Sequence, residues 1–146
     1  MIDVVAPETR SRMMASIKSR NTRPEVQVRR HLHALGFRYR LHRKDLPGRP
    51  DLVLPKYQVA IFIHGCFWHG HRGCRFATVP ATRTEFWTTK ISANQERDAT
   101  AGSRLRKTGW RIATVWECAL RANPDETIRC LADFIVSSEV SFEAAA

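Results

Sequence analysis

The sequence lacks any long apolar run, and it shows no internal repeat and no sign of disorder. Because a helix that crosses a bilayer needs about 20 predominantly apolar residues, no segment qualifies as a membrane span. The first residues, MIDVVAPETRSRMM, contain Asp3 and Glu8 and no apolar stretch, which argues against a secretory signal peptide. These absences predict a soluble protein of the cytoplasm.

Cysteine is also scarce, with only four among 146 residues. Disulfides rarely persist in a reducing cytoplasm, so these thiols are expected to bind a metal ion or to lie free in the core. A hydrophobic content of 43% is enough for one core, and the length is typical of one domain. We therefore expect a single globular domain without disulfides.

Acidic residues are few: 14 stand against 24 lysines and arginines, which leaves a net charge of +10. The imbalance is greatest in residues 1–50, which hold 12 of the 24 basic residues and only four acidic ones. Basic surfaces bind polyanions because each neutralised phosphate releases condensed counterions. The charge therefore favours a nucleic acid as the partner, with an ordinary solvated basic surface as the alternative.

Hydrophobic periodicity and turn residues divide the chain into helices and strands. Helices are predicted at 9–20, 22–36, 84–109 and 123–136, the third of them open to an interruption near Gly102, and strands at 37–43, 51–54, 58–63 and 110–117. This order predicts an α/β fold, a single domain with a mixed central β-sheet flanked by helices. The domain is expected to span residues 1–136, with a basic N-terminal helix at about 8–20 and a flexible tail at 137–146.

A cluster of metal-ligating residues, HGCFWHGHRGC, begins at His64 directly after a predicted strand. Cys66, His71 and Cys74 are spaced so that a loop can bring all three to one ion. Cys118 can supply the fourth ligand if the last predicted strand ends beside this loop. Three thiolates and one imidazole form a closed tetrahedral Zn²⁺ site, which would be structural because it leaves no position for water. The alternative is that the cysteines are core residues and the histidines are surface groups.

Two further histidines, His64 and His69, flank the same loop and are candidates for proton transfer. Histidine titrates near neutrality, so one could take a proton from an attacking water while the other stabilises or protonates a leaving oxygen. Asp51, at the start of a predicted strand, could hold a divalent cation against a phosphodiester. Each residue also has an ordinary structural interpretation, the histidines as packed side chains and Asp51 as the cap of a turn.

Several segments together carry a resemblance to a known family. They are PGRPDLVLPKYQVAIFIHGCFWHGH, VPATRTEFWTTKI, NQERD, LRKTGWRIATVWECAL and the early TRSRMMASIKSR, within residues 8–121. The chain resembles the very-short-patch-repair (Vsr) DNA mismatch endonucleases, for which HGCFWH, TRTEFW and VWECAL are highly specific. The resemblance implies a restriction-endonuclease-like fold of the PD-(D/E)xK class. Phe62 and His64 stand where that class usually has its second carboxylate and its lysine.

The resemblance also implies roles for individual residues. Asp51 and the backbone carbonyl of Ile63 would bind a catalytic Mg²⁺. His69 would be the general base for the attacking water, and His64 and Glu25 would hold metal-bound waters and the leaving group in place.

The chain departs from the family pattern in two places. Ile63 stands where the family often has threonine, a change that removes a hydroxyl but leaves the backbone carbonyl. The segment between His71 and Cys74 is one residue longer than the family pattern, which alters the geometry expected at Cys74 but not its identity as a ligand.

Apolar side chains complete the site that the resemblance implies. Phe67, Trp68 and Trp87 would enter the duplex at the mismatch, and Met14 and Ile17 would insert from the opposite groove. Such wedges unstack a base step at a cost of about a few kcal/mol, which wider contact recovers. The alternative places all five side chains in the core.

The activity that the resemblance implies is nicking of one strand on the 5′ side of the thymine in a T:G mismatch, which arises when 5-methylcytosine deaminates. Such a mismatch is paired less well than a matched step, so it is distorted more cheaply. We expect a bacterial monomer that acts on double-stranded DNA in the nucleoid and initiates very short patch repair. Mismatch-repair proteins are expected as further partners. Two other functions stay open: a zinc-stabilised DNA-binding module without catalysis, and a nickase for other mismatched or branched DNA.

Overall fold

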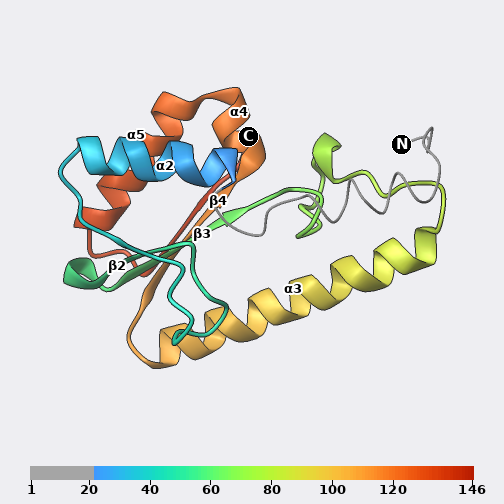
Figure 1. The fold of residues 1–146 in the computed structure, drawn as a ribbon, viewed down its shortest axis with the longest axis horizontal. Coiled ribbons are helices and arrows are strands. Elements are labelled where there is room, and N and C mark those ends of the chain that lie inside the picture. The colour runs from blue at the N-terminus through green and yellow to red at the C-terminus, as the bar shows by residue number, and fades with distance from the viewer. Residues whose placement is uncertain (1–21) are drawn as a thin grey trace.

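The computed structural model describes residues 22–146, which are built around one five-stranded β-sheet (Figure 1). The strands lie in the order of the sequence: β1 (Arg40–Leu41), β2 (Leu52–Leu54), β3 (Val59–His64), β4 (Arg111–Trp116) and β5 (Ser141–Ala144). The β1–β2 and β2–β3 pairs are antiparallel, whereas β3–β4 and β4–β5 are parallel. The prediction of an α/β fold with a mixed sheet is therefore confirmed.

Helices cover both faces of this sheet. They are α2 (Arg23–Ala34), α3 (Thr84–Lys107), α4 (Glu117–Ala122) and α5 (Pro124–Val136), with short 3₁₀ turns at Pro55–Tyr57 and Arg75–Ala77. α2 and α5 lie on one face and α3 on the other (Figure 1). No helix of the described part is long and apolar enough to span a membrane. The basic helix predicted at about 8–20 lies outside the described residues.

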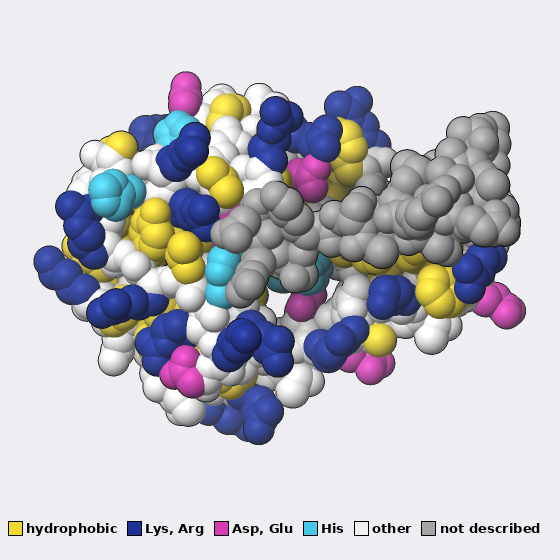
Figure 2. Space-filling model, in the orientation of Figure 1, with side chains coloured by type: hydrophobic (Ala, Val, Ile, Leu, Met, Phe, Trp, Pro, Cys, Tyr) yellow, Lys and Arg dark blue, Asp and Glu magenta, His cyan; other side chains and the backbone are white. Residues whose placement is uncertain are grey.

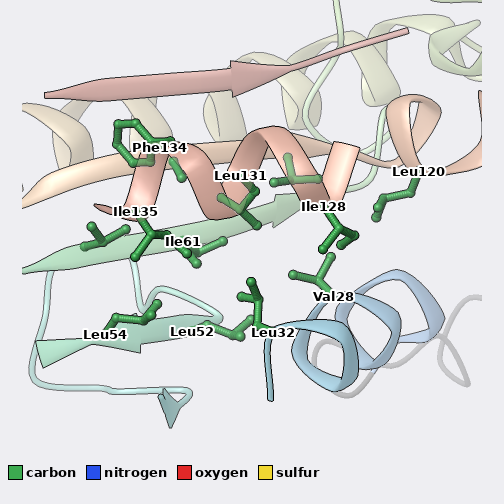
Figure 3. Close-up of a cluster of buried hydrophobic side chains, with 13 residues drawn as sticks. Val28, Leu32, Leu52, Leu54, Ile61, Leu120, Ile128, Leu131, Phe134 and Ile135 are labelled. Carbon is green, nitrogen blue, oxygen red and sulfur yellow. The ribbon is translucent and has the colours of Figure 1, made fainter. Parts of the chain in front are cut away.

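The main core lies between the sheet and the α2–α5 pair (Figure 3). Residues two apart on a strand share a face, so Leu52 and Leu54 of β2 and Ile61 of β3 point together toward the helices. These three side chains are fully buried. They meet the apolar faces of the helices, formed by Val28, Leu32, Ile128, Leu131, Phe134 and Ile135. This packing holds β2 and β3 in the position from which their ends build the site described below.

α3 is one unbroken helix of 24 residues, so the interruption considered at Gly102 does not occur. A glycine inside a helix costs about 1 kcal/mol relative to alanine, which the strong helix formers on both sides outweigh. In the last turns of α3, Leu105 packs on the sheet against Ile112 of β4. Its first half extends beyond the sheet, alongside the loop that follows β3 (Figure 1).

The prediction of a flexible tail at 137–146 is wrong, because β5 lies within it and pairs with β4. Phe142 stacks on Phe134 of α5 with the ring centroids 5.4 Å apart. On the neighbouring strand, the indole Nε1 of Trp116 donates a hydrogen bond to Glu143 at 2.9 Å. Only one large apolar side chain marks this strand in the sequence, and its tertiary contacts provide the rest of its stability.

The strand predicted at 37–43 is reduced to the two exposed residues of β1. At its start, the N–H of Phe37 donates to the carbonyl of Leu32 at the end of α2, at 3.0 Å, instead of to a strand. At its end, His42 has a φ of +48°, which stops an extended conformation. The alternating sequence pattern overestimated this strand because the chain turns at both ends.

Candidate active site and metal centre

Asp51 immediately precedes β2 and faces the adjoining strand. Its Oδ2 accepts a hydrogen bond from the backbone N–H of Ile63 on β3 at 2.7 Å. The antiparallel register, which pairs Leu52 with Ile61, brings the two residues together. Burial raises the pKa of Asp51 to about 6, although the Ile63 N–H opposes the rise. Asp51 and Ile63, the two residues predicted as Mg²⁺ ligands, therefore lie side by side. Burial partly removes the Asp51 carboxylate from solvent.

Glu25 reaches this carboxylate from the first turn of α2. Thr22 caps the helix, since its Oγ1 accepts the N–H of Glu25 at 3.4 Å, and Pro24 occupies the first turn. The cap holds Glu25 in a position where it is only 1% exposed. After burial, the charge of Glu25 is a further cause of the raised pKa of Asp51. Two acidic side chains thus share one buried region.

His42, a residue outside every sequence motif described above, lies beside both carboxylates. Its Nε2 contacts Oε1 of Glu25, and its backbone N–H donates to the carbonyl of Asp51 at 3.2 Å. The ligand atoms of Glu25, His42 and Asp51 all lie within 4.8 Å of one another, a grouping that could hold a metal ion. No spacing pattern in the sequence singles out His42, because only the tertiary fold brings it to the other two.

His64 and His69 come together where β3 ends. Their rings stack with centroids 3.8 Å apart and planes 5° apart. Burial, followed by the charge of His69, lowers the pKa of His64 to about 4, so His64 is neutral at pH 7. Its Nδ1 is buried and has no hydrogen-bond partner among the described residues. A buried polar atom of this kind usually bonds to water or an ion.

Asp98, on α3, is a second residue that the sequence analysis did not select. Its Oδ2 lies 2.6 Å from Nδ1 of His69, and this contact fixes the orientation of the imidazole. Its position in the segment NQERD was the available signal, but that segment suggested no role. A histidine oriented by a carboxylate is suited to taking a proton from water.

The carboxylate group and the histidine group adjoin each other. Asp51 accepts the N–H of Ile63, and the next residue of β3, His64, stacks on His69. A carboxylate pair able to hold a divalent cation therefore lies next to a histidine–aspartate pair able to accept a proton. Hydrolysis of a phosphodiester needs these two functions together.

The four residues predicted to bind zinc also converge. The ligand atoms of Cys66, His71, Cys74 and Cys118 lie within 4.8 Å of one another, and Cys66 and Cys118 are buried. Cys118 comes from the first turn of α4 rather than from the end of a strand, because β4 stops at Trp116. The longer segment before Cys74 does not remove its thiol from the group.

The surroundings of this group fit a tetrahedral metal ion. The imidazole of His71 stacks on Trp116 at a centroid distance of 4.0 Å, and its Nδ1 lies 3.5 Å from Sγ of Cys118. Burial raises the pKa of Cys66 to about 12, so its thiol stays protonated unless a cation offsets the burial. Three sulfur atoms and one nitrogen are the donors of a closed zinc site.

The predicted DNA wedges form an aromatic group between this loop and α3. Phe67, Trp68 and Trp87 make edge-to-face contacts with centroids 5.1 to 5.8 Å apart. Phe67 and Trp68 are half-buried, and Trp87 is 8% exposed. Asn94 of α3 anchors the loop, since its Nδ2 donates to the carbonyl of Trp68 at 2.8 Å. The other two predicted wedges, Met14 and Ile17, lie outside the described residues.

Basic side chains are numerous on one face of the molecule. Lysines and arginines spread over the face shown in Figure 2 and outnumber the acidic side chains there. A surface of this kind binds the phosphate backbone of nucleic acids without reading sequence.

Comparison with known proteins identifies relatives along most of the chain. Residues 2–75 match the family model described as DNA mismatch endonuclease Vsr. Type II nicking enzyme V.XorIIP of Xanthomonas oryzae pv. oryzae is 51% identical, over 82% of this chain and 88% of its own length. DNA mismatch endonuclease Vsr of Escherichia coli is 47% identical, over 91% of this chain and 85% of its own length. Type II nicking enzyme V.NmeAIP of Neisseria meningitidis is 46% identical, over 83% of this chain and 86% of its own length.

Proposed function

Since the chain belongs to the Vsr family of DNA endonucleases, we propose that it nicks one strand of double-stranded DNA on the 5′ side of the thymine in a T:G mismatch. The fold is then of the restriction-endonuclease type, with a single active site. A monomer with one such site cuts one strand and leaves the other intact. The nick starts the very short patch repair of a deaminated 5-methylcytosine.

The observation that carries this proposal is the position of Asp51, which is hydrogen-bonded to Ile63 directly before His64, and His64 stacks on His69. Asp98 contacts His69 in turn. The Asp51 carboxylate and the Ile63 carbonyl would hold Mg²⁺, and their oxygens are the ligands that this hard cation prefers. When bound, the cation supplies charge stabilisation to the phosphodiester under attack. A DNA-binding module would have no use for a buried carboxylate at this position, because the carboxylate repels phosphates.

The protein's own side chains handle the protons and the waters. His69, oriented by Asp98, takes the proton from the attacking water. His64 is neutral, and its buried Nδ1 is available to hold a water at the reaction centre. Glu25 holds a further water and helps to hold the leaving group in place.

Cys66, His71, Cys74 and Cys118 would hold a structural Zn²⁺, which would order the loop that follows β3. Between the first two ligands, the loop holds the base His69 and the wedges Phe67 and Trp68 within six residues of chain. A cation bound there would therefore help to position both the recognition side chains and the general base. Phe67, Trp68 and Trp87, together with Met14 and Ile17, unstack the mismatched step, which opposes distortion less than a matched one.

A strand-resolved nicking assay with Mg²⁺ tests the proposal. The substrates are duplexes with one T:G mismatch in several flanking sequences, each strand labelled in turn, beside the matched T:A duplex, other single mismatches and a branched junction. We expect one cut, 5′ of the mismatched thymine, and intact label in the opposite strand and in the T:A control. Cutting of the branched or other mismatched duplexes at an equal rate would contradict the substrate assignment. Binding without any cut would contradict the enzymatic function.

A further inference from the structure

We propose that His42 is a direct ligand of the cation held by Asp51, so that the site binds Mn²⁺ more tightly than Mg²⁺. The inference rests on the proposed function, since it concerns the same cation. It adds a nitrogen donor to a site for which the sequence indicated oxygen donors alone.

The first support is the position of the imidazole. The ligand atoms of His42, Glu25 and Asp51 are mutually within 4.8 Å, and they come from three different segments of the chain. A side chain that only decorated the surface would not be expected to point at two carboxylates. His42 is half-buried, and its Nε2 is directed at Glu25 in the region that Asp51 also faces.

The second support is the backbone that holds His42. Its φ of +48° lies in the left-handed region, which histidine adopts at some energetic cost. The N–H of His42 donates to the carbonyl of Asp51 at 3.2 Å, so the ligand residue and the candidate ligand are joined through the main chain. This link fixes the distance between the imidazole and the carboxylate before any cation binds.

The third support is the chemistry of the donors. Carboxylates suit Mg²⁺ and Mn²⁺ alike, whereas an imidazole suits first-row transition metals. Mg²⁺ also sheds its waters reluctantly, so a site that replaces several of them favours other divalent cations. An imidazole added to the oxygen donors of Asp51 and Ile63 therefore selects Mn²⁺ over Mg²⁺.

Electron paramagnetic resonance of bound Mn²⁺ tests this inference without any DNA. The protein is loaded with zinc first, so that the cysteine site is filled, and Mn²⁺ is then titrated. Spin-echo modulation from ¹⁴N, replaced by ¹⁵N modulation when histidine is labelled, identifies an imidazole bound to the ion. His42→Asn is the test variant because asparagine tolerates a φ of +48°. His33→Asn, on an exposed residue of α2, is the matched control.

We expect nitrogen modulation in the wild type and in His33→Asn, and its loss in His42→Asn. Removal of the ligand should weaken Mn²⁺ binding by at least about tenfold and Mg²⁺ binding by a smaller factor, because the imidazole suits the transition metal better. Asp51→Asn should abolish the same signal, which places the ion in this site. Modulation that survives in His42→Asn, or Mn²⁺ binding no tighter than Mg²⁺ binding, would overturn the inference.

The nicking assay separates this outcome from the fate of the proposed function. A protein that nicks T:G duplexes but shows no nitrogen modulation refutes the role of His42 alone. A protein that shows the modulation but never cuts DNA refutes the endonuclease function and leaves the metal site standing.

Discussion

Replacing Asp51 with asparagine should stabilise the protein in the absence of added Mg²⁺. Burial raises the pKa of Asp51 to about 6 from an ordinary value of 3.8. Between these two values the folded state binds more protons than the unfolded state, so the free energy of unfolding falls as the pH rises. Each pH unit of difference is worth about 1.4 kcal/mol, so the ionised carboxylate costs the folded protein at most about 3 kcal/mol at neutral pH.

Asparagine removes this cost and keeps the main contact. Its side-chain oxygen can still accept the N–H of Ile63, which lies 2.7 Å from Asp51 Oδ2. Urea unfolding of zinc-loaded wild type and Asp51→Asn, at pH 7.5 and pH 4.5, measures the difference. We expect Asp51→Asn to be more stable by up to about 3 kcal/mol at pH 7.5 and by only about 1 kcal/mol at pH 4.5, where the folded carboxyl is protonated but the unfolded one is still largely ionised. An Asp51→Asn protein that is equally or less stable at pH 7.5 would refute the claim that burial of the ionised Asp51 carboxylate destabilises the folded protein.

Three further changes probe the other groups of the site. Cys66→Ser should release the bound zinc and lower the free energy of unfolding by about 3 kcal/mol or more. Metal analysis and urea unfolding measure these effects, with Cys130→Ser as the control. Zinc retained at full stoichiometry would contradict the metal centre. Asp98→Asn should lower the single-turnover nicking rate by about 100-fold or more while DNA affinity stays unchanged, because the imidazole of His69 loses its orientation; an unaltered rate would exclude the pair from the reaction. Trp68→Ala should weaken binding to the T:G duplex by about 1–3 kcal/mol and leave binding to matched DNA unchanged, as measured by gel-shift titration. Equal losses of affinity for both duplexes would show that the indole does not recognise the mismatch.

Sequence patterns predicted the parts of the fold that local chemistry determines. α2 has its threonine cap and its proline in the first turn, and Asn123 caps α5, since its Oδ1 accepts the N–H of Glu126 at 3.1 Å. The zinc cluster was also accessible, because three of its ligands lie within nine residues. Capping motifs and dense ligand spacing are local signals that survive without any knowledge of tertiary structure.

The features that sequence patterns missed depend on contacts between distant segments. β5 has one large apolar residue and is stabilised by Phe134 and Trp116 from elsewhere in the chain. His42 is isolated in a basic segment, and it meets Glu25 only because the chain reverses after β1. Asp98 lies on α3, 29 residues from the histidine that it orients. Such pairings have no periodicity that a pattern could detect.

The measurement that tests the central claim most directly is single-turnover cutting of a T:G duplex by wild type and by Asp51→Asn, with the bound fraction determined by gel shift in the same reactions. The account predicts that both proteins bind the duplex, that wild type cuts 5′ of the thymine with Mg²⁺, and that Asp51→Asn does not cut. Because this variant is expected to be at least as stable as wild type, its loss of cutting cannot be attributed to unfolding. Cutting by Asp51→Asn at the wild-type rate would contradict the assignment of the catalytic cation to Asp51.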